Sequence, residues 1–178
     1  MTAVARFLHH FHQDEDGNGT IEFVIFVPFF FMIFMSTFEL GMLFTRQVML
    51  DRGVDMTVRL IRLGAVPNID ETIIRQMVCE RAVLIPDCLN QVRVEMRPVD
   101  PRNWGMIPNG ADCVNRNDPG VPPRQFTPGQ QNELMVVRVC ALFDPYFPTS
   151  GLGSQLPRQS NDAYALVSTA AFVVEPSN

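Results

Sequence analysis

Several residue types on which enzymes rely are scarce or absent in this sequence. It contains no lysine, and its three histidines, His9, His10 and His12, all precede residue 13. Mechanisms that pair serine or cysteine with histidine or lysine are therefore excluded for the rest of the chain, as is Schiff-base chemistry. The carboxylate pairs that remain, such as Asp112 with Asp118, are typical of solvated charge on loops. We expect that the protein is not an enzyme and that it uses no cofactor and no small-molecule substrate.

Charge is also scarce. Charged residues make up 19% of the 178 residues, whereas ordinary soluble domains have roughly 25%. The net charge of −5 gives a nucleic-acid partner no electrostatic support, so we expect none. The length is sufficient for one membrane-spanning segment and one modest soluble domain.

What the sequence does contain is one long apolar run over residues 21–44, IEFVIFVPFFFMIFMSTFELGMLF. Positions 23 to 38 carry no charge, and six phenylalanines lie between positions 23 and 34. As a helix the run would measure roughly 36 Å, enough to cross a hydrocarbon core of roughly 30 Å. A soluble chain of this size could rarely surround a helix that is apolar on every face. The run therefore predicts a transmembrane helix in contact with membrane lipid.

Two carboxylates inside this run indicate that the helix has protein neighbours. Glu22 lies at its start and Glu39 about four turns later. An ionised carboxylate at bilayer depth costs roughly 2.5 to 3.5 kcal/mol, so such a residue usually faces a protein group. We expect Glu22 and Glu39 to set the packing and register of neighbouring helices, with an ion pair between Glu39 and Arg46 of the same chain as the alternative for Glu39.

The segment before the helix, residues 14–25, allows a calcium interpretation. Asp14, Asp16 and Asn18 occupy the first, third and fifth positions of an EF-hand loop. That loop also needs a bidentate glutamate at its twelfth position, where Ile25 stands. A calcium-binding membrane protein is therefore a weak alternative, and we expect no metal site.

The same residues resemble a different motif more closely. The order Gly17, Asn18, Gly19, Thr20, Ile21, Glu22, Phe23 is similar to the processing site of type IV prepilins. The resemblance implies that a prepilin peptidase cuts after Gly17 and that Glu22 becomes the fifth residue of the mature chain. Cleavage would free an ammonium on Asn18, with which the carboxylate of a neighbouring subunit could pair.

The resemblance extends along the helix. Glu22-Phe23, an apolar run with one proline, Glu39-Leu40-Gly41 and an arginine-bearing helix together look like the TadE-like family of tight-adherence pili. It implies a minor pilin or pseudopilin that is needed for pilus assembly and cell adhesion, in the bacterial inner membrane or within the extracellular pilus. The implied partners are the prepilin peptidase, the major and minor pilin subunits and the pilus assembly platform. The alternative is an unprocessed single-pass anchor that presents a periplasmic binding domain.

Two signals disagree on the orientation of the helix. One arginine, Arg6, precedes it, whereas four follow it closely, which places the C-terminal domain inside the cell. Long domains, however, translocate largely regardless of charge. Four cysteines on the C-terminal side indicate an oxidising compartment. We expect the C-terminal domain in the periplasm.

The rest of the chain predicts an α+β fold in which the long N-terminal transmembrane helix continues as an amphipathic helix and a small antiparallel-sheet domain follows. The helix should continue over 45–63 and stop at Gly64. Asn68 and Glu71 have capping-box spacing, which predicts a second helix to about Val83. Expected strands lie at 92–96, with one face buried, and at 134–143 and 165–174, and a long surface loop over 98–131 holds Trp104, which we expect to cover the core.

These elements divide the chain into a leader over 1–17, the transmembrane helix and its extension over 18–64, and a disulfide-containing α+β domain over 65–178. The cysteines allow three pairings, and four free thiols are the alternative. A bridge joining Cys79 and Cys88, or one joining Cys113 and Cys140, would add roughly 2 to 4 kcal/mol.

Overall fold

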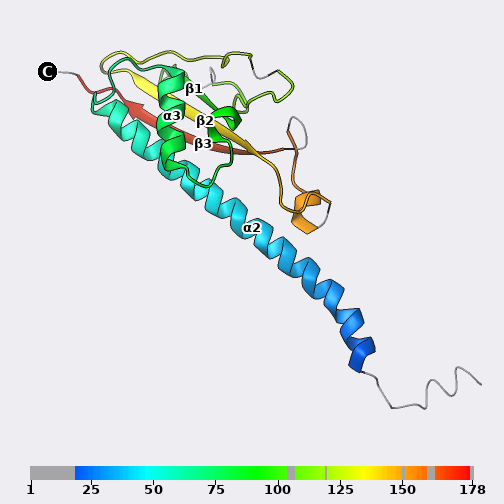
Figure 1. Cartoon of the computed structure of the whole chain (residues 1–178). Helices are drawn as coiled ribbons and strands as arrows, with labels where there is room; N and C mark the ends of the chain where they lie inside the picture. Colours follow the sequence, from blue (N-terminus) through cyan, green and yellow to red (C-terminus); the bar gives the residue numbers. More distant parts are fainter. Residues whose placement is uncertain (1–18, 104–106, 119, 150, 160–162, 177–178) are drawn as a thin grey trace, which may run out of the picture.

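In the computed structural model, one helix runs through most of the length of the molecule. The structure describes residues 19–103, 107–118, 120–149, 151–159 and 163–176. Helix α2 (Gly19–Arg62) has 44 residues, about 66 Å at 1.5 Å per residue. Its N-terminal half projects away from the rest of the chain (Figure 1). The leader (residues 1–17), the histidines and the calcium-like aspartates lie outside the described residues.

The C-terminus of α2 is a Schellman motif. The amide of Ala65 donates to the carbonyl of Leu60, and that of Gly64 donates to the carbonyl of Ile61. Gly64 adopts φ +67°, the left-handed conformation that this motif requires. The predicted stop at Gly64 is therefore confirmed.

Three antiparallel strands follow, in the spatial order β1-β2-β3. They are β1 (Val92–Pro98), β2 (Leu134–Phe143) and β3 (Tyr164–Val173). The β2 bounds equal the predicted ones, and β3 is shifted by one residue. The predicted α+β class, a long apolar helix followed by a small antiparallel sheet, is confirmed.

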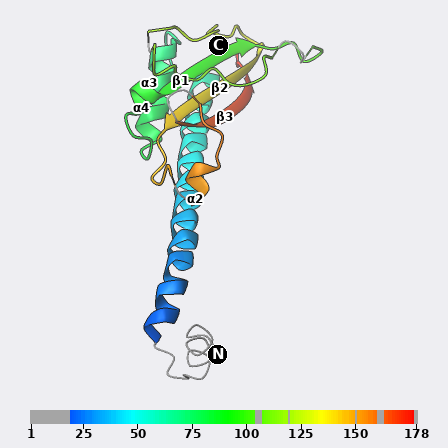
Figure 2. The same ribbon diagram turned by 90° about the vertical axis from the view of Figure 1, so that its right-hand side faces the viewer.

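One face of the sheet packs against the C-terminal half of α2 and against α3 (Glu71–Arg81) (Figures 1 and 2). The two helices approach closely at Gly53, where a Cβ atom would lie 3.0 Å from the carbonyl oxygen of Val78. The core side chains between helices and sheet include Leu50, Val54, Ile61, Ile74, Val78, Val92, Val94, Met96, Met135, Val137 and Val139. The amphipathic helix predicted over 45–63 thus packs within the chain through Leu50, Val54 and Ile61, whereas Val48 is 60% exposed.

The other face of β1 is buried as well, which corrects the expectation of a half-buried strand. Glu95 is 2% exposed and accepts two hydrogen bonds, of 2.9 and 2.8 Å, from Arg138 directly opposite on β2. Arg93 is buried too and lies 3.7 Å from Asp112 of the long loop. The alternation of apolar and charged residues in β1 therefore separates an apolar core from a buried layer of ion pairs.

Other local features differ from the sequence prediction. Helix α3 begins after Asp70, which makes no side-chain capping hydrogen bond, while Asn68 has φ +56°. The capping box was therefore wrong, although the helix itself exists. A short helix, α4 (Cys88–Gln91), and a 3-10 helix, η2 (Gly151–Ser154), were not predicted.

Two disulfides link the domain internally, and none of the described cysteines is free. Cys79 of α3 bonds to Cys88 of α4, with a Cα–Cα distance of 5.6 Å. Cys113 of the long loop bonds to Cys140 of β2, with a Cα–Cα distance of 5.2 Å. Of the three pairings that the sequence allowed, the structure has the one that joins the first cysteine to the second and the third to the fourth.

Candidate functional site

The apolar segment of α2, residues 19–38, is largely uncovered by the described part of its own chain, which contacts it near its end at Ser36 and Phe38. None of its residues is buried, and Phe26 and Phe23 are 70% and 67% exposed. The other exposed large apolar side chains of the segment are Ile21, Val24, Ile25, Phe29, Phe30, Phe31, Met32, Ile33, Phe34 and Phe38. Of the helices in the described residues, this one is long and apolar enough to cross a membrane. Its apolar faces need either lipid or other helices.

The residues of the predicted processing site lie at the tip of this segment. Gly17 and Asn18 lie outside the described residues. Glu22 and Phe23 are in the first turn and a half of α2, and both side chains are exposed. An exposed carboxylate at a helix N-terminus is favoured by the helix dipole. Its predicted role in the register between subunits stays a prediction.

Glu39 is the first buried residue of α2, with 1% of its surface exposed. Its two carboxylate oxygens accept hydrogen bonds of 3.1 Å from the amide of Tyr146, and one of them accepts a third from the amide of Phe147. The described ion pairs include none between Glu39 and Arg46. The partner of Glu39 is thus the backbone of a loop from the same chain.

That loop packs against one side of α2, and we call it the collar (residues 145–149 and 151–157). Phe38 makes edge-to-face contacts with Tyr146 and Phe147, with ring centroids 5.6 and 6.2 Å apart. Helix η2 of the collar lies beside α2 in both views (Figures 1 and 2). A Cβ atom at Gly151 would collide with the side chain of Ser36, so glycine permits the close approach.

Arg46 holds the collar from the domain side. Its guanidinium lies 4.7 Å from the ring centroid of Phe143 and 4.9 Å from that of Tyr146. It also donates a 3.0 Å hydrogen bond to the Tyr146 hydroxyl. Cation–π contacts of this kind stabilise by about 0.5 to 2 kcal/mol. Glu39 and Arg46, two turns apart on α2, therefore bind the same residue of the collar through different groups.

A third buried group, Tyr164 of β3, reaches the collar from the sheet. Its hydroxyl donates a hydrogen bond to the carbonyl of Gly153, and its ring contacts Phe143 edge to face. Burial raises the pKa of the Tyr164 hydroxyl above its usual value, and the nearby Glu39 carboxylate raises it further, against a smaller opposite effect of Arg158. Tyr164 therefore stays protonated as a hydrogen-bond donor.

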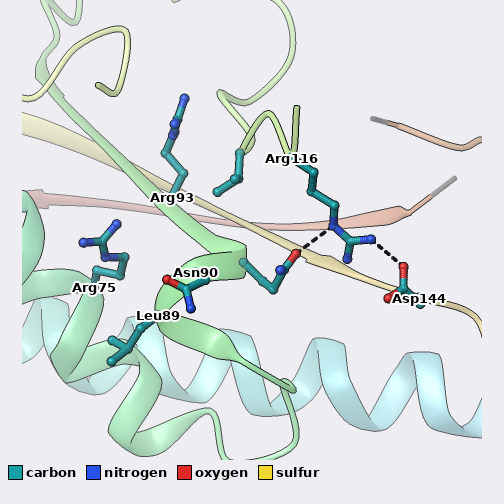
Figure 3. A pocket seen from close by; sticks show the side chains of 8 residues that line it. Arg75, Leu89, Asn90, Arg93, Arg116 and Asp144 are labelled. Atoms are coloured by element: carbon teal, nitrogen blue, oxygen red, sulfur yellow. Dashed lines mark hydrogen bonds and ion pairs between the residues drawn. The ribbon is translucent and has the colours of Figure 1, made fainter. Parts of the chain in front are cut away.

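A separate surface pocket of about 520 Å³ lies between α3, α4, β1 and the long loop. Its lining contains Arg75, Arg93 and Arg116, together with Asn90 of α4 (Figure 3). Each guanidinium has a carboxylate partner, since Arg75 lies 3.7 Å from Glu71, Arg93 lies 3.7 Å from Asp112, and Arg116 lies 2.5 Å from Asp144. The positive charge of this pocket is thus balanced by neighbouring carboxylates. No group of three or more His, Cys, Asp or Glu side chains in the described residues could hold a metal ion.

Comparison with known proteins gives a match to part of the long helix. Residues 17–59 match the family described as TadE-like protein. The TadE-like match begins at Gly17, the predicted cleavage residue, and covers the apolar segment and most of the packed half of α2. No curated protein and no solved structure matches the chain. The match covers 43 of the 178 residues and confirms the resemblance of this helix to the TadE-like family.

The TadE-like match ends before α3, so the sheet and the collar lie outside it. Sequence reasoning found Glu39 but missed its partners in the collar. One signal was available, because residues 145–157, PYFPTSGLGSQLP, carry no charge. In the structure this uncharged loop packs on α2 through Tyr146 and Phe147.

Proposed function

We propose that the chain is a membrane-anchored minor pilin or pseudopilin of the TadE-like kind, needed for assembly of a tight-adherence pilus. The observation that carries this proposal is the coincidence of the TadE-like match with a helix whose N-terminal 20 residues are apolar and unburied. Twenty residues of helix measure about 30 Å, the thickness of a hydrocarbon core. The segment would cross the inner membrane and pack there against other pilin subunits and the assembly platform.

The proposal assigns the N-terminal residues to processing. A prepilin peptidase would cut after Gly17 and leave the ammonium of Asn18 at the helix tip. The exposed Glu22 lies about one turn further on. A carboxylate and an ammonium from neighbouring chains attract more strongly in low dielectric than in water. Pairing of Glu22 with the new terminus of a neighbour would then fix the axial register of adjacent helices.

We place the domain that begins at residue 65 in the periplasm. Its two disulfides support this placement, because disulfides persist in oxidising compartments and are rare in the cytosol. Four arginines follow the span, but long domains translocate largely regardless of charge. The domain would act through contacts with other subunits and not through catalysis.

Intact-mass measurement and N-terminal sequencing test the proposal. Chain from cells with the peptidase should lack residues 1–17 and begin at Asn18, whereas chain from cells without it should be complete. A chain that still begins at Met1 or Thr2 in the presence of the peptidase would favour the unprocessed single-pass anchor. Equilibrium dialysis of a peptide over 10–30 against calcium tests the remaining alternative, which ends if millimolar calcium does not bind.

The register role of Glu22 needs a cellular assay. A strain that lacks the gene should lose pili and surface attachment, and wild-type chain should restore both. Glu22→Gln chain should be processed and inserted in the membrane but should restore few pili, because it cannot pair with an ammonium. Full restoration by Glu22→Gln would remove Glu22 from the mechanism.

A further inference from the structure

The length of the span determines where the membrane surface meets the domain. Twenty residues end at Phe38 when they are counted from Gly19, the start of α2, and at Met42 when they are counted from Phe23, the first residue after Glu22. The domain-side border of a hydrocarbon core of about 30 Å therefore falls near Phe38 to Met42. This is the part of α2 that the collar contacts, through Phe38 and Glu39. The collar therefore lies at the level of the membrane surface, provided that the proposed span is correct.

The composition of the collar is consistent with a place at the level of the membrane surface. Residues 145–157 contain no charge. Tyr146 is 47% exposed, and Phe147, Leu152 and Leu156 are half-buried. Tyrosine is enriched at membrane interfaces, where its ring lies among apolar groups and its hydroxyl reaches polar ones.

The hydrogen bonds of the collar are also consistent with a place at the membrane surface. Backbone groups that leave water need partners within the protein. The amides of Tyr146 and Phe147 donate to Glu39, and the carbonyls of Pro148 and Gly153 accept from Arg158. Gly153 also accepts from the hydroxyl of Tyr164. Several polar backbone groups of the collar are thus satisfied before it meets any other surface.

We propose that the collar is a lipid-contact surface, which lies in the boundary between headgroups and acyl chains on the domain side of the membrane. The Glu39 carboxylate lies behind it and is kept from lipid by the amides that it binds. The collar would hold the domain against the bilayer and set the depth of α2. This inference rests on the proposed span but goes beyond it, because a span can cross a membrane while its domain makes no lipid contact.

Depth-dependent quenching of tryptophan fluorescence tests the inference. The full chain, with Trp104 replaced by phenylalanine, would be reconstituted in phosphatidylcholine vesicles whose acyl chains carry bromine at shallow or at deep carbons. Each variant would carry one tryptophan. The collar variants are Tyr146→Trp and Leu152→Trp, and Phe31→Trp marks the middle of the span.

The matched control is Val173→Trp at the far end of the domain. Val173 is 48% exposed, close to the exposure of Tyr146. The ion pair between Arg62 and Glu175 places this end of β3 beside the C-terminus of α2, about 35 Å along the helix from Glu39. Bromine at either position on the acyl chains should leave the fluorescence of Val173→Trp unchanged.

We expect roughly a twofold loss of collar fluorescence with shallow bromines and a smaller loss with deep ones, as for groups held about 5 to 10 Å into the interface. Phe31→Trp should show the opposite order. If Phe31→Trp is quenched and neither collar variant is, the collar faces water or a protein partner, and the inference is overturned while the proposed span stands. If Phe31→Trp is not quenched, the span itself is wrong. Two collar variants are used so that one disturbed side chain does not decide the result.

Discussion

Replacement of Glu39 by alanine should release the collar from α2 without damage to the helix. Alanine is the best helix former, so the change costs nothing in helix propensity. It leaves the part-buried amides of Tyr146 and Phe147 without their acceptor. The expected effect is local opening of the collar, with β2 and the core unaffected.

The size of the effect follows from the hydrogen bonds that are lost. A hydrogen bond to a charged group contributes about 1.5 to 3 kcal/mol. Two donors are involved, and their distances of 3.1 Å are long for charge-assisted bonds, which favours the lower value for each. The opening free energy of the collar should therefore fall by about 3 kcal/mol, which corresponds to roughly a hundredfold faster amide exchange.

Hydrogen exchange of the full chain in detergent micelles measures this directly. The amides of Tyr146 and Phe147 should exchange about a hundredfold faster in Glu39→Ala, while those of β2 residues 135–141 keep their wild-type rates. Glu22→Ala is the matched control, because it removes an exposed carboxylate from the same helix and should leave both sets unchanged. Equal collar rates in Glu39→Ala and wild-type chain would refute the assignment of Glu39 as the acceptor that holds the collar.

Three further predictions concern the domain. Tyr164 should ionise only above pH 10, which absorbance can measure in a Tyr146→Phe background. Because the unfolded chain loses this proton at a lower pH than the folded chain, the unfolding free energy should fall as the pH rises above about 10. Loss of the Cys113–Cys140 bridge, which closes a loop of 27 residues, should lower the unfolding free energy in urea by about 3.5 kcal/mol. Gly53→Val should cost about 1 to 3 kcal/mol in the same assay, because its Cβ meets the α3 backbone.

Each of these has a control and a result that would count against it. Glu39→Gln should lower the pKa of Tyr164, and no change would mean that the carboxylate does not act on the hydroxyl. The bridge between Cys79 and Cys88 closes a shorter loop, so its loss should lower the unfolding free energy by less. The reverse order of the two effects would contradict the loop argument. Gly41→Val lies on the same helix, where a Cβ meets nothing within 4 Å, and a cost equal to that of Gly53→Val would exclude helix contact as the cause.

Periodicity predicted the elements of this fold, because burial of α2 and of β2 follows from patterns that are local in sequence. The bounds of β2 were recovered for that reason, and the stop at Gly64 was recovered because glycine readily adopts the left-handed conformation at a helix end. The cap of α3 was not, since an Asn68 in the left-handed conformation cannot act as a helix cap. Local spacing alone does not reveal which conformation a capping residue adopts.

Only part of the candidate site could be predicted from the sequence. The apolar segment and Glu22 are visible in the sequence, because both are local. The partners of Glu39 are not, since they lie more than a hundred residues away and bind through backbone amides, which leave no trace in residue type. The burial of the charged face of β1 was not predicted for a similar reason, because a charge such as Glu95 that is neutralised across the sheet looks solvated when one strand is considered alone.

Helix α2 runs as one element from Gly19 to Arg62, through the apolar segment and into the core of the domain. The apolar half and the sheet are therefore attached to one continuous helix, with no linker between them. A shift of this helix along the membrane normal by one turn, about 5.4 Å, would lift the sheet by the same height, and a rotation about the axis would swing it through the same angle. If the proposed function is right, a force on the domain along this axis would therefore be transmitted directly to the apolar half of the helix.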